Sequence, residues 1–150
     1  MDSTQITFTI QPDERAEEEL IERLKAFNDA GHPLIALRRQ NPDDPKPIQA
    51  LARDPQGNVI GGILAKVWLT WKWLQIDIVW VDEPFRNQNL GTRLLDEIER
   101  QAVELGCTRA KVSSWSFQAP GFYQKRGYVV YGELQNFPEG TTDYQLWKSL

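Results

Sequence analysis

The chain has 150 residues, a formal net charge of −4 and a sequence pI of about 5.1. This length suits one domain over residues 1–150 with a single core, and the acidic balance supplies no overall field that favours nucleic acid or an anionic membrane. One cysteine and one histidine exclude an intrachain disulfide and a zinc cluster. The lack of a long apolar run or a signal sequence predicts a cytoplasmic protein.

The first 47 residues are predicted to form a strand, a helix and a loop. Apolar and polar residues alternate over 6–10, which is typical of a strand with one buried face. A helix is predicted over 13–31 because apolar residues recur there at helical spacing after an acidic start. His32 follows as a capping or surface residue. Residues 34–47 begin with a short strand or helical turn, and their three prolines then predict a loop. That loop either borders a substrate cleft or is a plain connector.

An antiparallel meander is predicted next, with strands over 48–53, 59–68 and 74–81. The segment between the first two strands, Asp54-Pro-Gln-Gly-Asn58, is typical of a hairpin turn, and residues 69–73 make the second turn. Gly61-Gly62 inside the middle strand indicates a bulge or a close approach of another backbone.

A helix over 89–105 is predicted after the meander. Its apolar stripe consists of Leu90, Leu94, Ile98, Ala102 and Leu105. A strand over 108–113 follows by a right-handed crossover, so it should lie parallel to the strand over 74–81. Cys107 is interpreted as a small buried hydrophobic residue. A short helix over 118–126 and a hairpin of strands 128–134 and 144–148 complete the predicted elements.

A polar turn, Arg86-Asn-Gln-Asn-Leu-Gly91, lies between the strand that ends at Val81 and the helix that follows. A strand that turns tightly into a helix presents unpaired N–H groups at the positive helix end, and such an end binds phosphate or pyrophosphate. Neither G-x-x-x-x-G-K-[ST] nor G-x-G-x-x-G is present. The alternative interpretation of the turn alone is an ordinary capped helix start.

The turn is preceded by Val79-x-Val81 and followed by Phe122-Tyr-x-x-x-Gly-Tyr128. In this order, these motifs resemble the GNAT superfamily of acetyl-CoA-dependent N-acetyltransferases. Arg86 and Gly91 match the family's pyrophosphate motif, [RQ]-x-x-G-x-[GA]. Asn89 replaces its first glycine, and asparagine adopts positive φ more readily than most residues. The resemblance implies an α/β (α+β) GNAT fold, with a mixed, mostly antiparallel twisted sheet, helices on both faces and splayed parallel fourth and fifth strands.

The resemblance also implies acetyl-CoA as co-substrate and no metal. The backbone N–H groups of residues 88–92 would hold the pyrophosphate of coenzyme A (CoA), and Arg86 would shape the loop. The backbone of residues 79–81 would pair with the pantetheine arm, and an N–H near Val81 would stabilise the thioester oxyanion. Ser116 stands where many members have an asparagine that contacts the arm. The predicted cofactor-binding residues are Val79, Trp80, Val81, Arg86, Asn87, Gln88, Asn89, Leu90, Gly91, Thr92, Ser116 and Tyr123.

The implied reaction is attack of a neutral amine on the thioester in a ternary complex, followed by protonation of the thiolate. Tyr123 stands at the position of the family's general-acid tyrosine, although it could instead only pack the short helix. Gln75 replaces a glutamate that some members carry. Asp77, which shares a face with Gln75 in a regular strand, is the nearest candidate base. Ordered water is an equal alternative, and Glu133 is more remote.

The acceptor is predicted to be the primary amine of a small soluble molecule, with a protein lysine or N-terminal amine as the alternative. Five tryptophans are expected near the strand ends, at positions 68, 71, 73, 80 and 115. They would wall a substrate pocket or attract a cation, or else pack in the core or a homodimer interface. Trp71 and Trp73, placed in a turn, are the better candidates for substrate contact. A catalytically silent acyl-CoA-binding module and a plain interaction domain are the competing functions.

Overall fold

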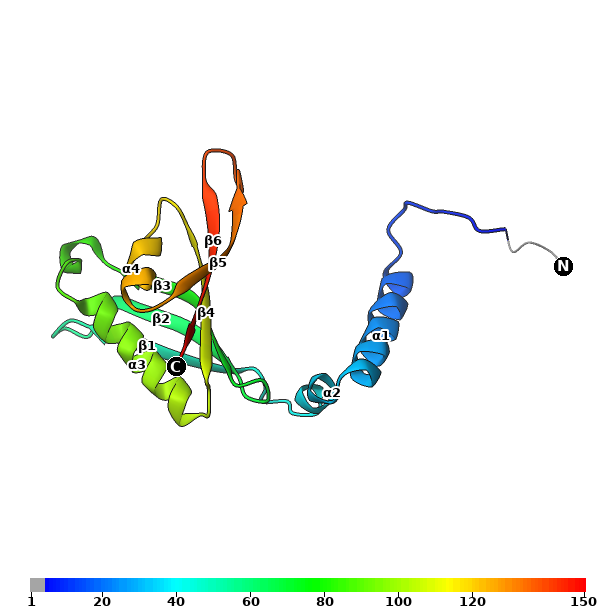
Figure 1. Cartoon of the computed structure of the whole chain (residues 1–150), viewed down its shortest axis with the longest axis horizontal. Helices are drawn as coiled ribbons and strands as arrows, with labels where there is room; N and C mark the ends of the chain where they lie inside the picture. Colours follow the sequence, from blue (N-terminus) through cyan, green and yellow to red (C-terminus); the bar gives the residue numbers. More distant parts are fainter. Residues whose placement is uncertain (1–4) are drawn as a thin grey trace. The chain divides into compact units, whose positions relative to one another are not determined.

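The computed structural model of the chain describes residues 5–150 (Figure 1) and divides into two compact units, residues 1–37 and 38–150. The first unit, of which residues 5–37 are described, carries helix α1 and most of α2. The second carries the sheet and the remaining helices. All the predicted site residues fall in the second unit, so the site is built from that unit alone. A single domain over residues 1–150 stays a prediction.

Helix α1 spans Glu14–Gly31 and matches the predicted bounds. It begins where the Asp13 carboxylate accepts a hydrogen bond from the Ala16 N–H at 3.0 Å, which is the usual way to satisfy a free N–H in the first turn. His32 follows the helix, and its Nδ1 accepts a hydrogen bond from the Leu34 N–H at 3.1 Å, so its predicted capping role is confirmed. Neither α1 nor any other helix in residues 5–150 is long and apolar enough to cross a membrane.

Two predictions for the N-terminal region are wrong. Residues 6–10 form no strand, and their apolar side chains are exposed, Phe8 to 92%. Alternation supplies an apolar face, but a strand exists only where a neighbouring strand takes up its backbone hydrogen bonds. The predicted loop is also shorter than expected, because helix α2 spans Pro33–Arg39 and strand β1 begins at Lys46. Pro47 lies inside β1, which is tolerated because β1 is an edge strand.

The second unit is built on a six-stranded sheet in the order β1-β2-β3-β4-β6-β5. Its strands are β1 (Lys46–Arg53), β2 (Val59–Trp68), β3 (Trp73–Val81), β4 (Arg109–Trp115), β5 (Val129–Gln135) and β6 (Thr142–Ser149). The helices of this unit are the 3-10 turn η1 (Glu83–Phe85), α3 (Leu90–Glu104) and α4 (Pro120–Lys125). Neighbouring strands are antiparallel except β3 and β4, which are parallel because α3 crosses between them. The predicted mixed, mostly antiparallel sheet is confirmed.

The meander β1-β2-β3 matches its prediction except at its second turn. In the first turn, the Asp54 carboxylate accepts hydrogen bonds from the N–H groups of Gln56 and Asn58, both at 2.9 Å. The predicted close approach at Gly62 is confirmed, because a Cβ there would lie 3.0 Å from the Ala50 carbonyl oxygen. Trp73, by contrast, is the first residue of β3 rather than part of the turn.

The core lies between the sheet and helix α3, which runs along β1, β2 and β3 (Figure 1). Leu94, Ile98 and Ala102 of the predicted stripe are buried, and Leu95, outside that stripe, is fully buried as well. Cys107, after the helix, is also buried, and burial raises the pKa of its thiol to about 11. Its predicted role as a small hydrophobic residue is therefore confirmed.

One polar group ties α3 to the far strands of the sheet. The Glu99 carboxylate accepts hydrogen bonds from Lys148 Nζ on β6, at 2.8 and 3.1 Å, and from the Tyr128 hydroxyl at 3.0 Å. The side chains of Glu99 and Lys148 are only 14% and 25% exposed. A carboxylate that accepts three hydrogen bonds, two from an ammonium and one from a phenol, is well compensated for its loss of water. This contact fixes the helix whose first turn forms part of the candidate site.

Candidate active site

A cavity opens between β3 and β4 where these parallel strands separate. Their pairing is limited to Trp73–Gln75 against Arg109–Lys111, although both strands continue beyond it. The cavity has a volume of about 920 Å³ and is lined by the second half of β3, the first turn of α3, β4 and α4. The predicted splay is confirmed, and it leaves the backbone edge of β3 from Ile76 onward without a partner strand on that side.

A β-bulge sets the side-chain directions along the splayed half of β3. Leu64 of β2 pairs with Ile78 and Ala65 pairs with Ile76, so Asp77 is an extra residue in β3. A bulge reverses the alternation of faces. Ile76 is buried and Val79 packs on the same core, whereas Ile78 is 54% exposed. The regular strand assumed in placing Asp77 is therefore wrong, although the Asp77 and Gln75 side chains still meet.

The first turn of α3 has the features of an anion site. Asn87 and Asn89 lie before it with φ of 63° and 60°, in the left-handed region where asparagine is among the least strained non-glycine residues. Within the described chain, no side chain caps the helix start and no acidic residue lies in its first turn. The N–H groups and the positive end of the helix dipole are thus available to a ligand.

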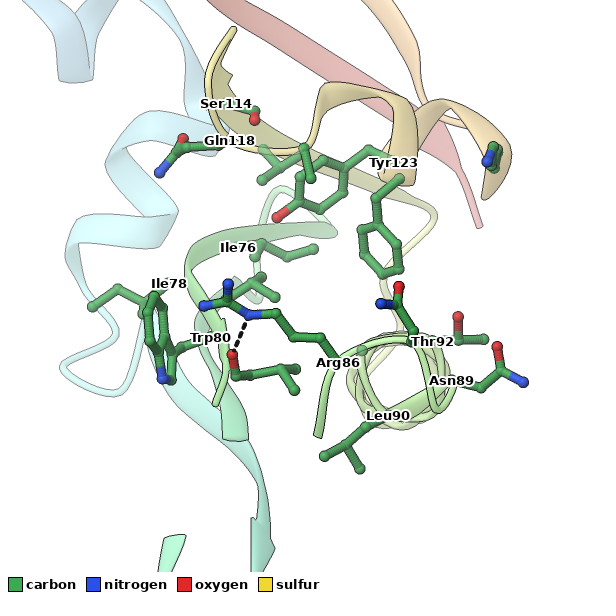
Figure 2. Close-up of a pocket in the computed structure, with 18 of the residues that line it drawn as sticks. Ile76, Ile78, Trp80, Arg86, Asn89, Leu90, Thr92, Ser114, Gln118 and Tyr123 are labelled. Atoms are coloured by element: carbon green, nitrogen blue, oxygen red, sulfur yellow. Dashed lines mark hydrogen bonds between the residues drawn. The ribbon is translucent and has the colours of Figure 1, made fainter. Parts of the chain in front are cut away.

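Arg86 lies in the turn before α3 and contacts the end of β3. Its Nε donates a hydrogen bond to the Val81 carbonyl oxygen at 2.9 Å, and its guanidinium lies 5.0 Å from the centre of the Trp80 ring. Figure 2 shows this hydrogen bond as a dashed line beside the cavity. The contact joins the end of β3 to the turn and directs the chain toward the helix start.

Tyr123 on α4 points its hydroxyl into the cavity, in the direction of Ile76 (Figure 2). Its ring is held edge-on against Phe122 and Tyr128, at centroid distances of 5.2 and 5.7 Å. Only 7% of the residue is exposed, and burial raises the pKa of the phenol to about 12. The neighbouring Tyr128 hydroxyl donates to Glu99, whereas the Tyr123 hydroxyl is directed to the cavity. A protonated phenol directed into an open cavity can donate a proton to a ligand.

Asp77 lines the same cavity, and two polar side chains contact its carboxylate. Gln75 Nε2 donates a hydrogen bond to Asp77 Oδ1 at 3.0 Å, and Lys66 Nζ lies 3.8 Å from Oδ2. The carboxylate is 39% exposed, so water reaches it freely. Glu133, the more remote candidate base, is exposed on β5 and does not line the cavity.

The sequence profile of the Acetyltransferase (GNAT) family matches residues 8–128 of this chain. The chain belongs to the GNAT family. The members of this family are acetyltransferases, and this chain is an acyltransferase. The profile covers the bulged strand, the turn before α3 and the tyrosine of α4, which are the three parts of the site described above.

Three known proteins illustrate the similarity. The blasticidin-S acetyltransferase of Streptomyces morookaense is 38% identical over 133 residues, which is 85% of this chain and 96% of that protein. The crystal structure of an acetyltransferase from Bacillus cereus has a TM-score of 0.78 and 27% identity, and the match covers 96% of this chain and 98% of that one. An aminoglycoside 6'-N-acetyltransferase, solved with coenzyme A, shares the fold with a TM-score of 0.61, 20% identity and coverage of 73% and 74%.

Most of the predicted site residues of this GNAT enzyme line the cavity. They are Asp77, Val79, Trp80, Val81, Arg86, Asn87, Asn89, Leu90, Gly91, Thr92 and Tyr123. Two do not. The Gln88 side chain turns back to donate to the Pro84 carbonyl oxygen at 3.3 Å, and the Ser116 hydroxyl accepts a hydrogen bond from the Thr142 N–H on β6 at 3.1 Å. The roles of these thirteen residues stay predictions.

The structure adds lining residues that the sequence did not single out. Ser114 is 3% exposed, lines the cavity, and has one long hydrogen bond of 3.4 Å to the Trp115 carbonyl oxygen. Phe122 lies 3.5 Å from where a Cβ on Gly91 would stand, so the aromatic ring closes over the first turn of α3. The burial alternation of β4 could have indicated Ser114, whereas the Phe122–Gly91 contact depends on tertiary packing. Residues 5–150 hold no group of three His, Cys, Asp or Glu side chains suited to a metal ion.

The tryptophans of the acetyltransferase fall into separate groups. Trp80 lines the site cavity, and Trp115 stacks on Phe117 at 5.7 Å. The others lie along a second cavity of about 690 Å³, lined by Trp68, Trp71, Trp73, Gln75, Arg109, Lys111, Tyr131 and Trp147. None of the six is among the buried core residues of the described chain. Core packing, one of the two alternatives for these side chains, is therefore wrong, whereas a substrate wall and a homodimer interface stay predictions.

Proposed function

We propose that this GNAT enzyme transfers the acetyl group of acetyl-CoA to the primary amine of a small molecule, by direct attack in a ternary complex. The observation that carries the proposal is that one cavity joins an uncapped helix start to the buried Tyr123 hydroxyl. The helix start would bind the pyrophosphate of CoA, and the hydroxyl would donate a proton to its sulfur. The splay between β3 and β4 offers the space between them to the pantetheine arm.

The cofactor would be held mainly by backbone groups. The N–H groups of residues 88–92 would bind the pyrophosphate, where the helix dipole favours negative charge. The unpaired edge of β3 over residues 79–81 would hydrogen-bond to the amides of the pantetheine arm, as an added strand would. No metal is needed in this arrangement, because the developing charges meet N–H groups and a phenol.

The reaction requires two proton transfers. The neutral amine nitrogen forms a bond to the thioester carbon, and the resulting oxyanion accepts hydrogen bonds from backbone N–H groups near Val81. The carbon–sulfur bond then breaks, and the Tyr123 hydroxyl donates its proton to the departing thiolate. The ammonium proton passes to Asp77 or to water. Asp77 lines the cavity, where its carboxylate contacts Gln75 Nε2 and Lys66 Nζ.

The preference for a small-molecule acceptor is supported by the relative named as a blasticidin-S acetyltransferase, which matches 85% of this chain. Blasticidin S is accordingly the first acceptor to test.

We place the reaction in the cytoplasm, in keeping with the free thiol of Cys107. A homodimer stays a prediction.

An acetyl-transfer assay tests the proposed function directly. Thiol release from acetyl-CoA would be measured with blasticidin S, other antibiotic amines, polyamines and a lysine peptide, and the acetylated product would be identified by mass spectrometry. We expect amine-dependent thiol release with a small molecule. CoA binding without turnover on any amine would instead support the silent acyl-CoA-binding module, and the absence of CoA binding by calorimetry would support the interaction domain.

Asn89 provides a second test, directed at the cofactor turn. Its φ of 60° suits glycine at least as well as asparagine, but strains a β-branched residue by about 1–2 kcal/mol. Asn89→Gly should therefore bind CoA within about threefold of the wild type, whereas Asn89→Val should bind about tenfold more weakly. Titration calorimetry with CoA measures both. Equal affinity of the Val variant would show that this turn does not hold the cofactor.

A further inference from the structure

Arg126 approaches the first turn of α3 from a distant part of the chain. It follows directly after α4, and its Nη2 donates a hydrogen bond to the hydroxyl of Thr92, 34 residues earlier in the sequence. Thr92 lines the cavity and belongs to the first turn of α3. The guanidinium is thus part-buried beside the N–H groups to which the proposed function assigns the pyrophosphate.

The position of this arginine is electrostatically unfavourable with respect to the helix beside it. The start of a helix carries a partial positive charge, so a cation beside it is repelled. No acidic residue lies in the first turn of α3, and none of the ion pairs among residues 5–150 includes Arg126. Arg126 does not itself line the cavity, but Thr92, Arg86 and Lys125 do, and the one carboxylate that lines it in the described chain is Asp77. A protein with a net charge of −4 therefore concentrates positive charge here.

We propose that Arg126, held by the Thr92 hydroxyl, binds a phosphate group of the CoA cofactor and makes the site selective for the phosphorylated form. Arginine suits this role because its planar guanidinium presents several N–H donors and binds phosphate oxygens in pairs. One donor is engaged by Thr92, which orients the group, and the others remain for the ligand. This inference rests on the proposed function, since it names a further contact in the same cofactor site.

CoA has two sources of phosphate, the diphosphate and the 3'-phosphate of the ribose. Both the diphosphate and the 3'-phosphate would be bound by N–H donors and positive charge, which the helix start and Arg126 supply. Dephospho-CoA lacks only the 3'-phosphate, and pantetheine lacks all phosphate. Comparison of these three ligands therefore distinguishes the two sources.

The test is titration calorimetry of Arg126→Gln against CoA, dephospho-CoA and pantetheine at low and high salt. Glutamine keeps a neutral donor for Thr92 but removes the charge. We expect CoA to bind about 10- to 100-fold more weakly to the variant at low salt, with the difference shrinking as salt screens the interaction. Pantetheine should bind both proteins equally. If the loss persists with dephospho-CoA, Arg126 binds the diphosphate; if it vanishes, Arg126 binds the 3'-phosphate.

Two controls separate this role from a purely structural one. Arg53→Gln removes one positive charge at the β1–β2 turn, where Arg53 donates to the Gly57 carbonyl oxygen at 2.9 Å, and should leave CoA affinity unchanged. Arg126→Lys, which keeps the charge, should fall between the wild type and the Gln variant, and it serves as the test if the Gln variant does not fold. A lower melting temperature with CoA affinity within about fivefold of the wild type would overturn the inference and leave Arg126 as a tether between α4 and α3. Wild-type protein that does not bind CoA would instead refute the proposed function.

Discussion

Replacement of Tyr123 by phenylalanine should lower kcat by about 100-fold or more, with a much smaller change in the KM for acetyl-CoA. The variant removes one oxygen from a ring that is 93% buried and held by Phe122 and Tyr128, so the fold of α4 should survive. What is lost is the hydroxyl that we propose as the proton donor to the departing thiolate. Steady-state rates at saturating acetyl-CoA and amine measure the effect.

Tyr128→Phe is the matched control for this prediction. Tyr128 belongs to the same aromatic cluster, but its hydroxyl donates to Glu99 and it does not line the site cavity. The control should keep kcat within about threefold of the wild type while losing some stability. Equal rates for Tyr123→Phe and the wild type would remove Tyr123 from the mechanism, and equal losses in both variants would assign the effect to packing.

The pH dependence gives this prediction a second readout. Burial raises the pKa of Tyr123 to about 12, so the phenol keeps its proton throughout the range in which the amine becomes neutral. The rate should therefore rise with pH and not fall again below about pH 10 because of Tyr123. Burial, and then Glu99, also raise the pKa of Tyr128. Both phenols ionise more readily in the unfolded chain, so stability should be retained below about pH 10 and decline as pH rises further.

Replacement of Glu99 by alanine should destabilise the fold by about 2–3 kcal/mol. The change leaves the Lys148 ammonium and the Tyr128 hydroxyl without the carboxylate that both contact, and these groups are mostly shielded from water. It also loosens the attachment of α3 to β6. Urea unfolding followed by tryptophan fluorescence measures the loss as a lower midpoint with an unchanged slope.

Glu97→Ala is the control for the stability prediction. Glu97 lies on the same helix, but its contacts are to Arg100 and Gln101 on the exposed face. Exposed pairs of this kind contribute little, so the control should unfold close to the wild type. If Glu99→Ala unfolded at the wild-type midpoint, the contact with Lys148 and Tyr128 would be incidental to the fold.

The parts of the fold that could be predicted from the sequence are those whose signals are local. The Asp54–Asn58 turn carries its own hydrogen-bonding residues, and the stripe of α3 repeats at helical spacing. Residues 6–10 carry an equally clear local pattern and yet form no strand, because pairing depends on a partner that the pattern cannot supply. Likewise, no glycine or proline marks the bulge at Asp77, which is set by the pairing of β3 with β2.

The candidate site likewise contains residues that could be predicted from the sequence and a contact that could not. Arg86, Gly91 and Tyr123 could be predicted because they match motifs of the GNAT family in the same order along the chain. The structure brings all three to one cavity. The contact between Arg126 and Thr92 joins residues 34 positions apart, and neither residue type is unusual in its segment. Such a contact is determined by how α4 packs beside α3, which a sequence pattern does not encode.

The bulge at Asp77 also bears on how this enzyme could change its substrate during evolution. Because one extra residue reverses the faces of β3, Ile78 and Trp80 line the cavity and yet stand more than half exposed, at 54% and 56%. Exchanges of exposed side chains usually alter stability only slightly. Val79 and Val81, which alternate with them along the strand, pack against the core and lack this freedom. Under the proposed function, exchanges at these two positions should alter the preference for the acceptor with little loss of stability.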